Sequence, residues 1–102
     1  MEYKTLGAFG PQISSIGLGA WAFGGSWKMG WGSQDDDESY KAIRCSFEHG
    51  ANWIDTAAIY GLGHSEMVVG AAIKNFPRDE ILIFTKCGRH LDQYGMIKSD
   101  LR

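Results

Sequence analysis

Residues 52–66 read NWIDTAAIYGLGHSE, and the fold follows from this stretch. A short apolar run from Ala51 to Ile54 ends in the acid Asp55, which is typical of a buried strand. Glycines follow at 61 and 63 and indicate a loop, after which Ser65 is predicted to act as the N-cap of a helix. The stretch therefore predicts a strand, a loop rich in polar groups and the start of a helix.

The segments on either side extend this alternation of strands and helices. Residues 15–21 are a strand-like run with glycines, and residues 22–33 are an aromatic loop. Four acids at 35–38 predict a helix start, and Gly50 marks its end. Small or apolar side chains recur there with helical spacing, at Ser39, Ala42, Ile43, Ser46 and Phe47.

The second half of the alternation follows the same logic. Val69, Ala72, Ile73 and Phe76 form a second helical stripe, which ends at Pro77. Residues 81–85 are a continuous apolar run, typical of a parallel strand that is covered on both faces. The order β, α, β, α, β predicts an α/β fold with a parallel sheet and right-handed crossovers.

The length of the chain and the patterns near its two ends indicate how the domain is organised. A chain of 102 residues favours one domain. Residues 3–6 and 12–16, separated by the turn-forming segment 7–11, predict an N-terminal β-hairpin within residues 1–16. Residues 87–102 show no clear period, and the chain is expected to stop just before a further helix.

Composition excludes several classes of function. A hydrophobic fraction of 44% and a net charge of −2 are those of an ordinary globular chain without a basic field, which argues against nucleic acid or an anionic membrane surface as a partner. No apolar run approaches the roughly 20 residues that span a bilayer. Two cysteines without close spacing, and the lack of a secretory signal, predict a cytoplasmic protein with reduced thiols.

Three residues carry the chemistry that we expect. In a parallel sheet the carboxyl ends of the strands share one edge and neighbouring strands lie about 4.8 Å apart, so Asp55 and Lys86 are predicted to form an ion pair. Tyr60 lies in the loop above them. A nearby ammonium favours the ionised form of a tyrosine, and a carboxylate orients the lysine. The three therefore predict a tyrosine that can donate a proton near neutral pH.

Three ordered motifs then resemble one family. Residues 17–21 (GLGAW), Asp55-Thr56-Ala57 with Tyr60-Gly61 and Ser65-Glu66, and residues 84–86 (FTK) are similar to the aldo-keto reductases along nearly the whole chain. The resemblance implies a (β/α)8 barrel, of which this chain supplies the N-terminal hairpin and the first three strands and two helices. It also implies a single barrel domain, of which residues 1–102 are the N-terminal part.

The resemblance further implies an activity and a cofactor. Hydride passes from NADP(H) to the carbonyl carbon of an aldehyde or ketone, Tyr60 donates the proton, and Asp55 and Lys86 assist it; NAD(H) is an alternative cofactor. Ala20, Trp21 and Asp55 are implied to lie against the nicotinamide end. The aromatic loop suggests a substrate wall that includes Trp21 and Trp27, although Trp27 can equally serve to anchor the loop.

The chain departs from the family in its length. The family's catalytic histidine follows the fourth strand, and His49, His64 and His90 do not match it, because the first ends a helix and the others are expected in loops. A barrel takes about 250 residues, so the chain is read as a fragment that is inactive alone. An open sheet edge exposes unpaired backbone groups, so the remainder of the barrel or self-association is expected to cover it.

Other hypotheses remain open at this point. Residues 17–22 fit the G-x-G-x-x-G/A pattern of a Rossmann domain, which requires a helix at once after residue 21. Cys45 and His49 have the spacing of two zinc ligands, although no further ligands are evident and a buried core cysteine is expected instead. Cys87 beside Lys86 is either an activated thiol or a small strand-end residue. A nicotinamide-nucleotide-binding regulatory protein with the same fold is a second class of function.

Overall fold

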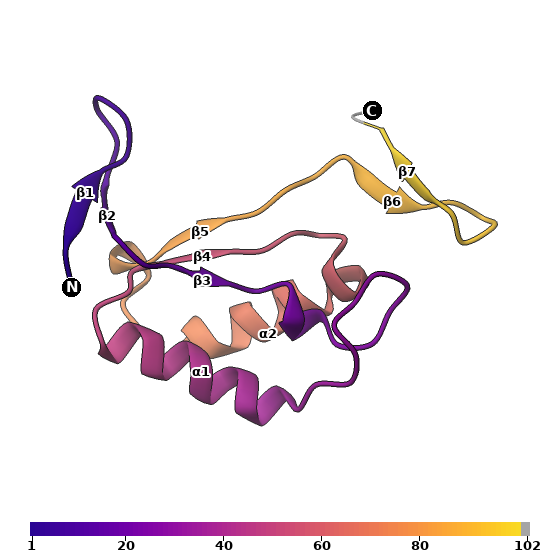
Figure 1. Ribbon diagram of the computed structural model, residues 1–102, viewed down its shortest axis with the longest axis horizontal. Helices are drawn as coiled ribbons and strands as arrows, with labels where there is room; N and C mark the ends of the chain where they lie inside the picture. The colour runs from indigo at the N-terminus through magenta and orange to yellow at the C-terminus, as the bar shows by residue number, and fades with distance from the viewer. Residues whose placement is uncertain (101–102) are drawn as a thin grey trace.

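The computed structural model describes residues 1–100 as three small sheets and two α-helices (Figure 1). The strands are β1 (Tyr3–Thr5), β2 (Gln12–Ser14), β3 (Leu18–Gly19), β4 (Trp53–Asp55), β5 (Leu82–Phe84), β6 (Arg89–Leu91) and β7 (Ile97–Ser99). The α-helices are α1 (Asp36–Glu48) and α2 (His64–Ile73). Three 3₁₀ turns connect them: η1 (Ala22–Gly24), η2 (Tyr60–Gly63) and η3 (Arg78–Glu80).

The central sheet has the predicted parallel topology. Its strand order is β3-β4-β5, with Gly19 opposite Asp55 and Asp55 opposite Phe84. Helices α1 and α2 both lie on one side of this sheet (Figure 1). Within residues 1–100 these helices cover one face of β5, and the expected cover of its other face stays a prediction. The structure thus shows a mixed α/β unit with parallel β-α-β connections, and residues 1–100 form no closed barrel.

Helix α1 confirms the expectation from its acids and its apolar spacing. Asp35 is the N-cap, and its side chain accepts a hydrogen bond from the backbone N–H of Asp37 at 2.9 Å. Ser39 and Ile43 are buried against the sheet, and Ile43 is fully buried. Cys45 lies on the outer face of the helix and is exposed, which contradicts the expected core position. The helical stripe predicted for this segment had already left Cys45 out, whereas Ala42, which belongs to that stripe, is exposed.

Helix α2 begins one residue earlier than its predicted cap. Gly63 is the N-cap position and supplies no side-chain hydrogen bond, while Ser65 lies inside the first turn and is fully buried. The prediction of Ser65 as N-cap was therefore wrong. Its hydroxyl instead forms hydrogen bonds with Ala20 and Thr56, which lie outside the helix. The helix ends at Ile73, so the predicted end at Pro77 was too late and Phe76 lies outside the helix; Pro77 opens the 3₁₀ turn η3.

The core lies between the helices and one face of the sheet. Its buried members come from all the central elements: Ala20, Phe23, Ile43, Ile54, Val68 and Val69. Full burial of an isoleucine contributes about 1.5–3 kcal/mol to folding, so the two isoleucines anchor α1 to β4. This packing sets where the carboxyl end of each strand lies, and with it the candidate site.

The predicted N-terminal hairpin is confirmed and lies at the amino ends of the central strands (Figure 1). The Tyr3 hydroxyl donates to the Gly50 carbonyl at 2.7 Å, and the Asn52 side chain bonds the backbone of Ser14 and of Gln12. These contacts hold the hairpin beside the start of β4. It therefore lies away from the edge where Asp55 ends.

A second hairpin, β6–β7, was missed by the sequence analysis. Asp92 organises its turn, because its carboxylate accepts from the N–H groups of Tyr94 and Met96, both at 2.9 Å. Gly95 completes the turn with φ of 74°. An Asx turn followed by a glycine was the available signal. The expectation of a helix after the chain's last residues, and residues 101–102 themselves, lie outside the described part.

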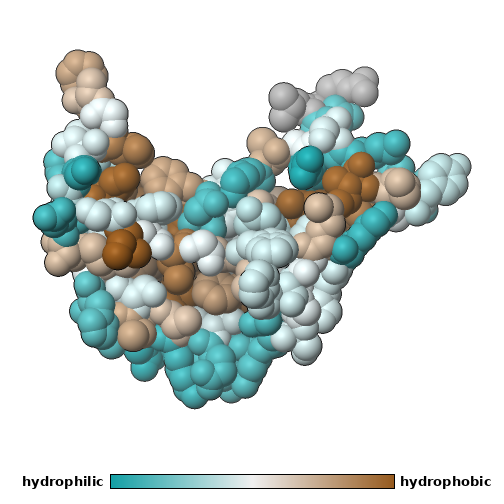
Figure 2. Space-filling model, in the orientation of Figure 1, coloured by the Kyte–Doolittle hydropathy of each residue, from teal (hydrophilic) through white to brown (hydrophobic). Residues whose placement is uncertain are grey.

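The space-filling view shows a molecule that is hollowed between the two hairpins (Figure 2). On the sheet face away from the helices, the rings of Trp53 and Phe84 meet edge to face, with centroids 5.9 Å apart. Neither side chain is fully buried. Among residues 1–100, no helix is long and apolar enough to cross a membrane.

Candidate functional site

The carboxyl ends of β3, β4 and β5 form one rim, on which the predicted site residues lie. The Ala20 N–H donates to the Asp55 carbonyl at 2.9 Å, and Thr56 N–H donates to the Phe84 carbonyl at 2.8 Å. The Ala58 N–H then donates to the Lys86 carbonyl at 3.3 Å. Strand pairing therefore continues past the ends of β4 and β5, and it brings Asp55 beside Lys86.

Lys86 makes the central contacts of the site. Its ammonium nitrogen lies 3.0 and 2.9 Å from the two carboxylate oxygens of Asp55 and 2.8 Å from the Thr56 carbonyl oxygen. It is also 3.4 Å from the Tyr60 hydroxyl and 5.0 Å from the centroid of the Tyr60 ring. The structure thus brings together the three residues predicted to carry the chemistry.

The charge of Lys86 is favoured by these partners. Burial lowers the pKa of Lys86, but the hydrogen bonds and charges of Asp55 and Tyr60 outweigh that effect, so its pKa is raised above 10.5. The Lys86 and Asp55 side chains remain 51% and 40% exposed. Such an exposed ion pair contributes under about 1 kcal/mol to stability, so its main effect is to orient the Lys86 side chain.

Tyr60 is placed by a close contact between two 3₁₀ turns. Gly61 has φ of 61°, and the backbones of Gly24 in η1 and Gly61 in η2 touch. A Cβ added at Gly24 would lie 2.7 Å from the Gly61 nitrogen and 2.8 Å from the Tyr60 carbonyl carbon. The two glycines allow this approach, which fixes the backbone from which the tyrosine projects.

Trp21 follows β3 on the same rim and is 40% exposed. Its indole N–H donates to the Met29 carbonyl at 2.9 Å, and its ring meets Trp31 edge to face at 5.2 Å. Trp27 is half-buried in the same loop, and within residues 1–100 its indole nitrogen is buried without a hydrogen-bond partner. Ala20 is fully buried in the core, beneath the rim.

Residues 22–33 contain one 3₁₀ turn and otherwise bends and turns, with no α-helix. The Rossmann hypothesis required a helix there, so it was wrong. Cys45 Sγ lies 3.7 Å from His49 Nδ1, but no group of three or more His, Cys, Asp or Glu side chains gathers within residues 1–100 to hold a metal ion. Cys87 is exposed and lies three residues beyond the end of β5, so it does not end that strand.

The sequence predicted the secondary-structure position of one of the three histidines correctly and of the other two incorrectly. His49 caps the end of α1, as expected. His64 is the first residue of α2, where its Nε2 lies 2.8 Å from Asp36, and His90 lies in β6, so the loop assignments were wrong. None of the three histidines forms a hydrogen bond with Lys86 or Tyr60.

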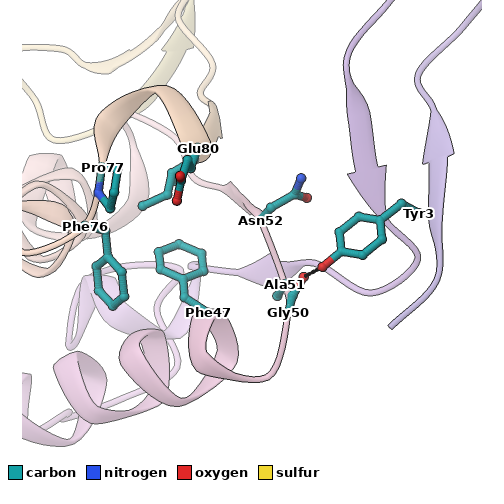
Figure 3. Close-up of a pocket in the computed structure, with 9 residues that line it drawn as sticks. Tyr3, Phe47, Gly50, Ala51, Asn52, Phe76, Pro77 and Glu80 are labelled. Carbon is teal, nitrogen blue, oxygen red and sulfur yellow. Dashed lines mark hydrogen bonds between the residues drawn. The ribbon is translucent and has the colours of Figure 1, made fainter.

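Two hollows differ in their relation to this rim. One, of about 600 Å³, is lined by Lys86, Cys87, Gly88, Arg89, Ser99 and Asp100 and opens beside the site. The other, of about 270 Å³, lies at the opposite end of the sheet, with the edge-to-face pair of Phe47 and Phe76 on one side and Tyr3 on the other (Figure 3). The first is the one from which a ligand can reach Lys86.

Residues 15–102 match the Aldo/keto reductase family. The chain belongs to this family. It is similar to the aldo-keto reductase YhdN of Bacillus subtilis (strain 168), with 44% identity over 84% of this chain and 25% of the relative. It is also 41% identical to the NADH-specific methylglyoxal reductase of Escherichia coli (strain K12), over 95% of this chain and 29% of the relative.

Solved structures of the family agree with the fold. A glycerol dehydrogenase from Gluconobacter oxydans matches with a TM-score of 0.78 and 35% identity, over 98% of this chain and 31% of that protein. An aldo-keto reductase from Klebsiella pneumoniae in complex with NADPH matches with a TM-score of 0.61 and 33% identity, over 74% and 24% of the two chains. The chain thus spans about a quarter to a third of the length of these relatives.

Thr56, Ser65 and Glu66 are polar residues around the site that the sequence analysis did not assign to it. Thr56 follows Asp55 directly, so its side chain points to the opposite face, toward α2. That alternation was the signal for a contact between Thr56 and the helix start. Which atom it meets depends on how α2 packs, and periodicity does not contain that information.

Proposed function

We propose that this chain supplies the proton-donating part of the active site of an NAD(P)H-dependent oxidoreductase that reduces a small aldehyde or ketone to an alcohol. The observation that carries the proposal is the contact of one ammonium with both its carboxylate partner and a tyrosine hydroxyl. Lys86 Nζ lies within 3.0 Å of both Asp55 oxygens and 3.4 Å from Tyr60 Oη. Family membership supports the same reaction.

Carbonyl reduction needs a hydride at carbon and a proton at oxygen. NAD(P)H, when bound at this rim, would supply the hydride. Tyr60 donates its hydroxyl proton to the carbonyl oxygen and is left as a phenolate, which the ammonium of Lys86 stabilises. Asp55 holds Lys86 in place, and the raised pKa of Lys86 keeps the ammonium charged through neutral and mildly alkaline pH.

The residues on the rim fit the nicotinamide end of such a cofactor. The Asp55 carboxylate is 40% exposed and is able to accept hydrogen bonds from ribose hydroxyls, while the partly exposed Trp21 offers an apolar ring. Ala20 is fully buried beneath them, so in this proposal it supports the contact surface through its backbone. Either NADPH or NADH is compatible with these groups.

We further propose that β3, β4 and β5 are the first three strands of a (β/α)8 barrel, with residues 1–16 as a hairpin across its amino end. In that arrangement the half-buried Trp53 and Phe84 line the barrel interior, and later elements cover the free edge of β5. Trp21 and Trp27 contribute to the wall of the substrate pocket. The family's catalytic histidine is expected on a later strand, so residues 1–102 alone are expected to be inactive.

Tyr60→Phe in the complete reductase tests the function. General acid catalysis contributes roughly 10²–10⁴-fold, so we expect the rate of carbonyl reduction to fall by at least about 10²-fold while NAD(P)H still binds. Tyr94→Phe is the matched control, because Tyr94 is 80% exposed on the β6–β7 turn. An unchanged rate in Tyr60→Phe would remove Tyr60 from its role. Nucleotide binding without turnover in the unmodified protein would favour the regulatory class instead.

A further inference from the structure

The first turn of α2 contacts the ends of all three central strands through two consecutive side chains. Ser65 is fully buried, and its hydroxyl donates to the carbonyl of Ala20, just after β3, at 2.7 Å. The same oxygen lies 2.9 Å from the hydroxyl of Thr56, just after β4. Glu66 accepts a hydrogen bond from the hydroxyl of Thr85, just after β5, at 2.6 Å.

The direction of the buried hydrogen bonds follows from the groups present. A carbonyl oxygen only accepts, so the single proton of Ser65 is committed to Ala20. Thr56 must therefore donate to Ser65. The Thr56 side chain is held by this bond, and the Thr56 carbonyl accepts from the ammonium of Lys86 at 2.8 Å. One residue thus links the helix start to the lysine.

Glu66 is linked to Lys86 indirectly, through the neighbouring residue Thr85. Thr85 immediately precedes Lys86, so the hydrogen bond from Thr85 to Glu66 restrains the backbone from which Lys86 projects. Thr85 is exposed and Glu66 is half-buried, so water can replace this bond at small cost to stability. A small energetic role and a location next to the reacting groups indicate that orientation is the main effect.

We propose that Ser65 and Glu66 are positioning residues for the carbonyl reduction, which act by holding Thr56 and Thr85 and so fix Lys86 against Tyr60. This inference rests on the proposed function. The two residues form no hydrogen bond with the tyrosine hydroxyl or the lysine ammonium, so they act through their partners. A misplacement of about 1 Å in a catalytic group costs up to roughly 10²-fold in rate, which sets the scale of the effect.

Variants of the exposed hydrogen bond between Thr85 and Glu66, the surface variants, test the proposal in the complete reductase. Thr85→Val removes the hydroxyl and Glu66→Ala removes the acceptor, and for each we expect kcat to fall by roughly 10- to 10²-fold with little change in KM. Thr85→Ser and Glu66→Gln keep a hydroxyl and an acceptor oxygen, so they should restore most of the rate. Glu48→Ala is a control on the exposed end of α1 and should behave as the unmodified enzyme.

Two further measurements separate positioning from general destabilisation. If Thr85 acts through Lys86, Thr85→Val combined with Lys86→Met should be no slower than Lys86→Met alone. Melting temperatures should change by no more than a few degrees in all the surface variants. Ser65→Ala tests the buried hydrogen bonds: we expect kcat to fall in this variant as well, and a Ser65→Ala protein that folds and keeps the full kcat would overturn the role of Ser65.

Unchanged kcat in both Thr85→Val and Glu66→Ala would overturn the proposal, as would a loss that multiplies with that of Lys86→Met. The proposed function has its own test in Tyr60→Phe. If Tyr60→Phe abolishes reduction while Thr85→Val and Glu66→Ala keep the full rate, the function stands and the positioning role fails. If Tyr60→Phe keeps the full rate, the function itself fails.

Discussion

The contact between Gly24 and Gly61 should be sensitive to a single added methyl group. Gly24→Ala would place a Cβ 2.7 Å from the Gly61 nitrogen, where ordinary contact needs about 3.4 Å, so one turn must move by about 0.7 Å. Overpacking against backbone costs about 1–3 kcal/mol in unfolding free energy. The Tyr60 hydroxyl starts 3.4 Å from Lys86 Nζ, so a shift of this size is enough to break that hydrogen bond.

Alanine substitutions at Gly61 and Gly63 distinguish the cost of the close contact from the cost of backbone strain. Gly61 has φ of 61°, and an added Cβ would run into the Gly24 carbonyl, so Gly61→Ala combines both costs at roughly 2–5 kcal/mol. Gly63 has φ of 104° with open space around it, so Gly63→Ala carries the strain alone, about 1–3 kcal/mol. The expected order of destabilisation therefore places Gly61→Ala above both of the others.

Urea unfolding followed by tryptophan fluorescence, together with steady-state carbonyl reduction by the complete reductase, measures both effects. Gly24→Ala and Gly61→Ala should lower kcat as well as stability, because both displace Tyr60. Gly70→Ala inside α2 is the control, because an added Cβ there would meet no atom within 4 Å. A Gly24→Ala protein whose unfolding free energy stays within about 0.5 kcal/mol of the unmodified protein would refute the close approach of the two turns.

Two further predictions concern charge and helix capping. The pKa of Lys86 is raised above 10.5 in the folded state, so its stabilising contribution is present below pH 10.5 and is lost as the pH rises through the folded pKa. The difference in unfolding free energy between the unmodified protein and Lys86→Met, under about 1 kcal/mol, should be constant from pH 7 to about 10 and shrink above that; a difference that grows in alkali would contradict it. Asp35→Ala removes the cap of α1 and should cost about 1 kcal/mol in urea unfolding, whereas Asp35→Asn keeps an acceptor for the Asp37 N–H and should cost much less.

Most of the central topology was predictable because it depends on local patterns. The acids before α1, the glycine after it and the apolar run ending at Asp55 are signals that lie within a few residues of the elements they define. The topology of parallel strands then requires their carboxyl ends to share an edge. The pairing of Asp55 with Lys86, which lie 31 residues apart, follows from that topology and was confirmed at 2.9–3.0 Å.

The sequence by itself determined the order of strands and helices from the N-terminal hairpin to β5, the family resemblance and the three residues on the rim, because periodicity and motif spacing are properties of the chain. Only the tertiary structure decided the role of Ser65, whose spacing suited a helix cap but whose hydroxyl is drawn to Ala20 and Thr56 when α2 packs on the sheet. It likewise decided that Cys45 is exposed and that Gly24 meets Gly61. These outcomes depend on how elements distant in sequence pack, and a local pattern carries no information about that packing.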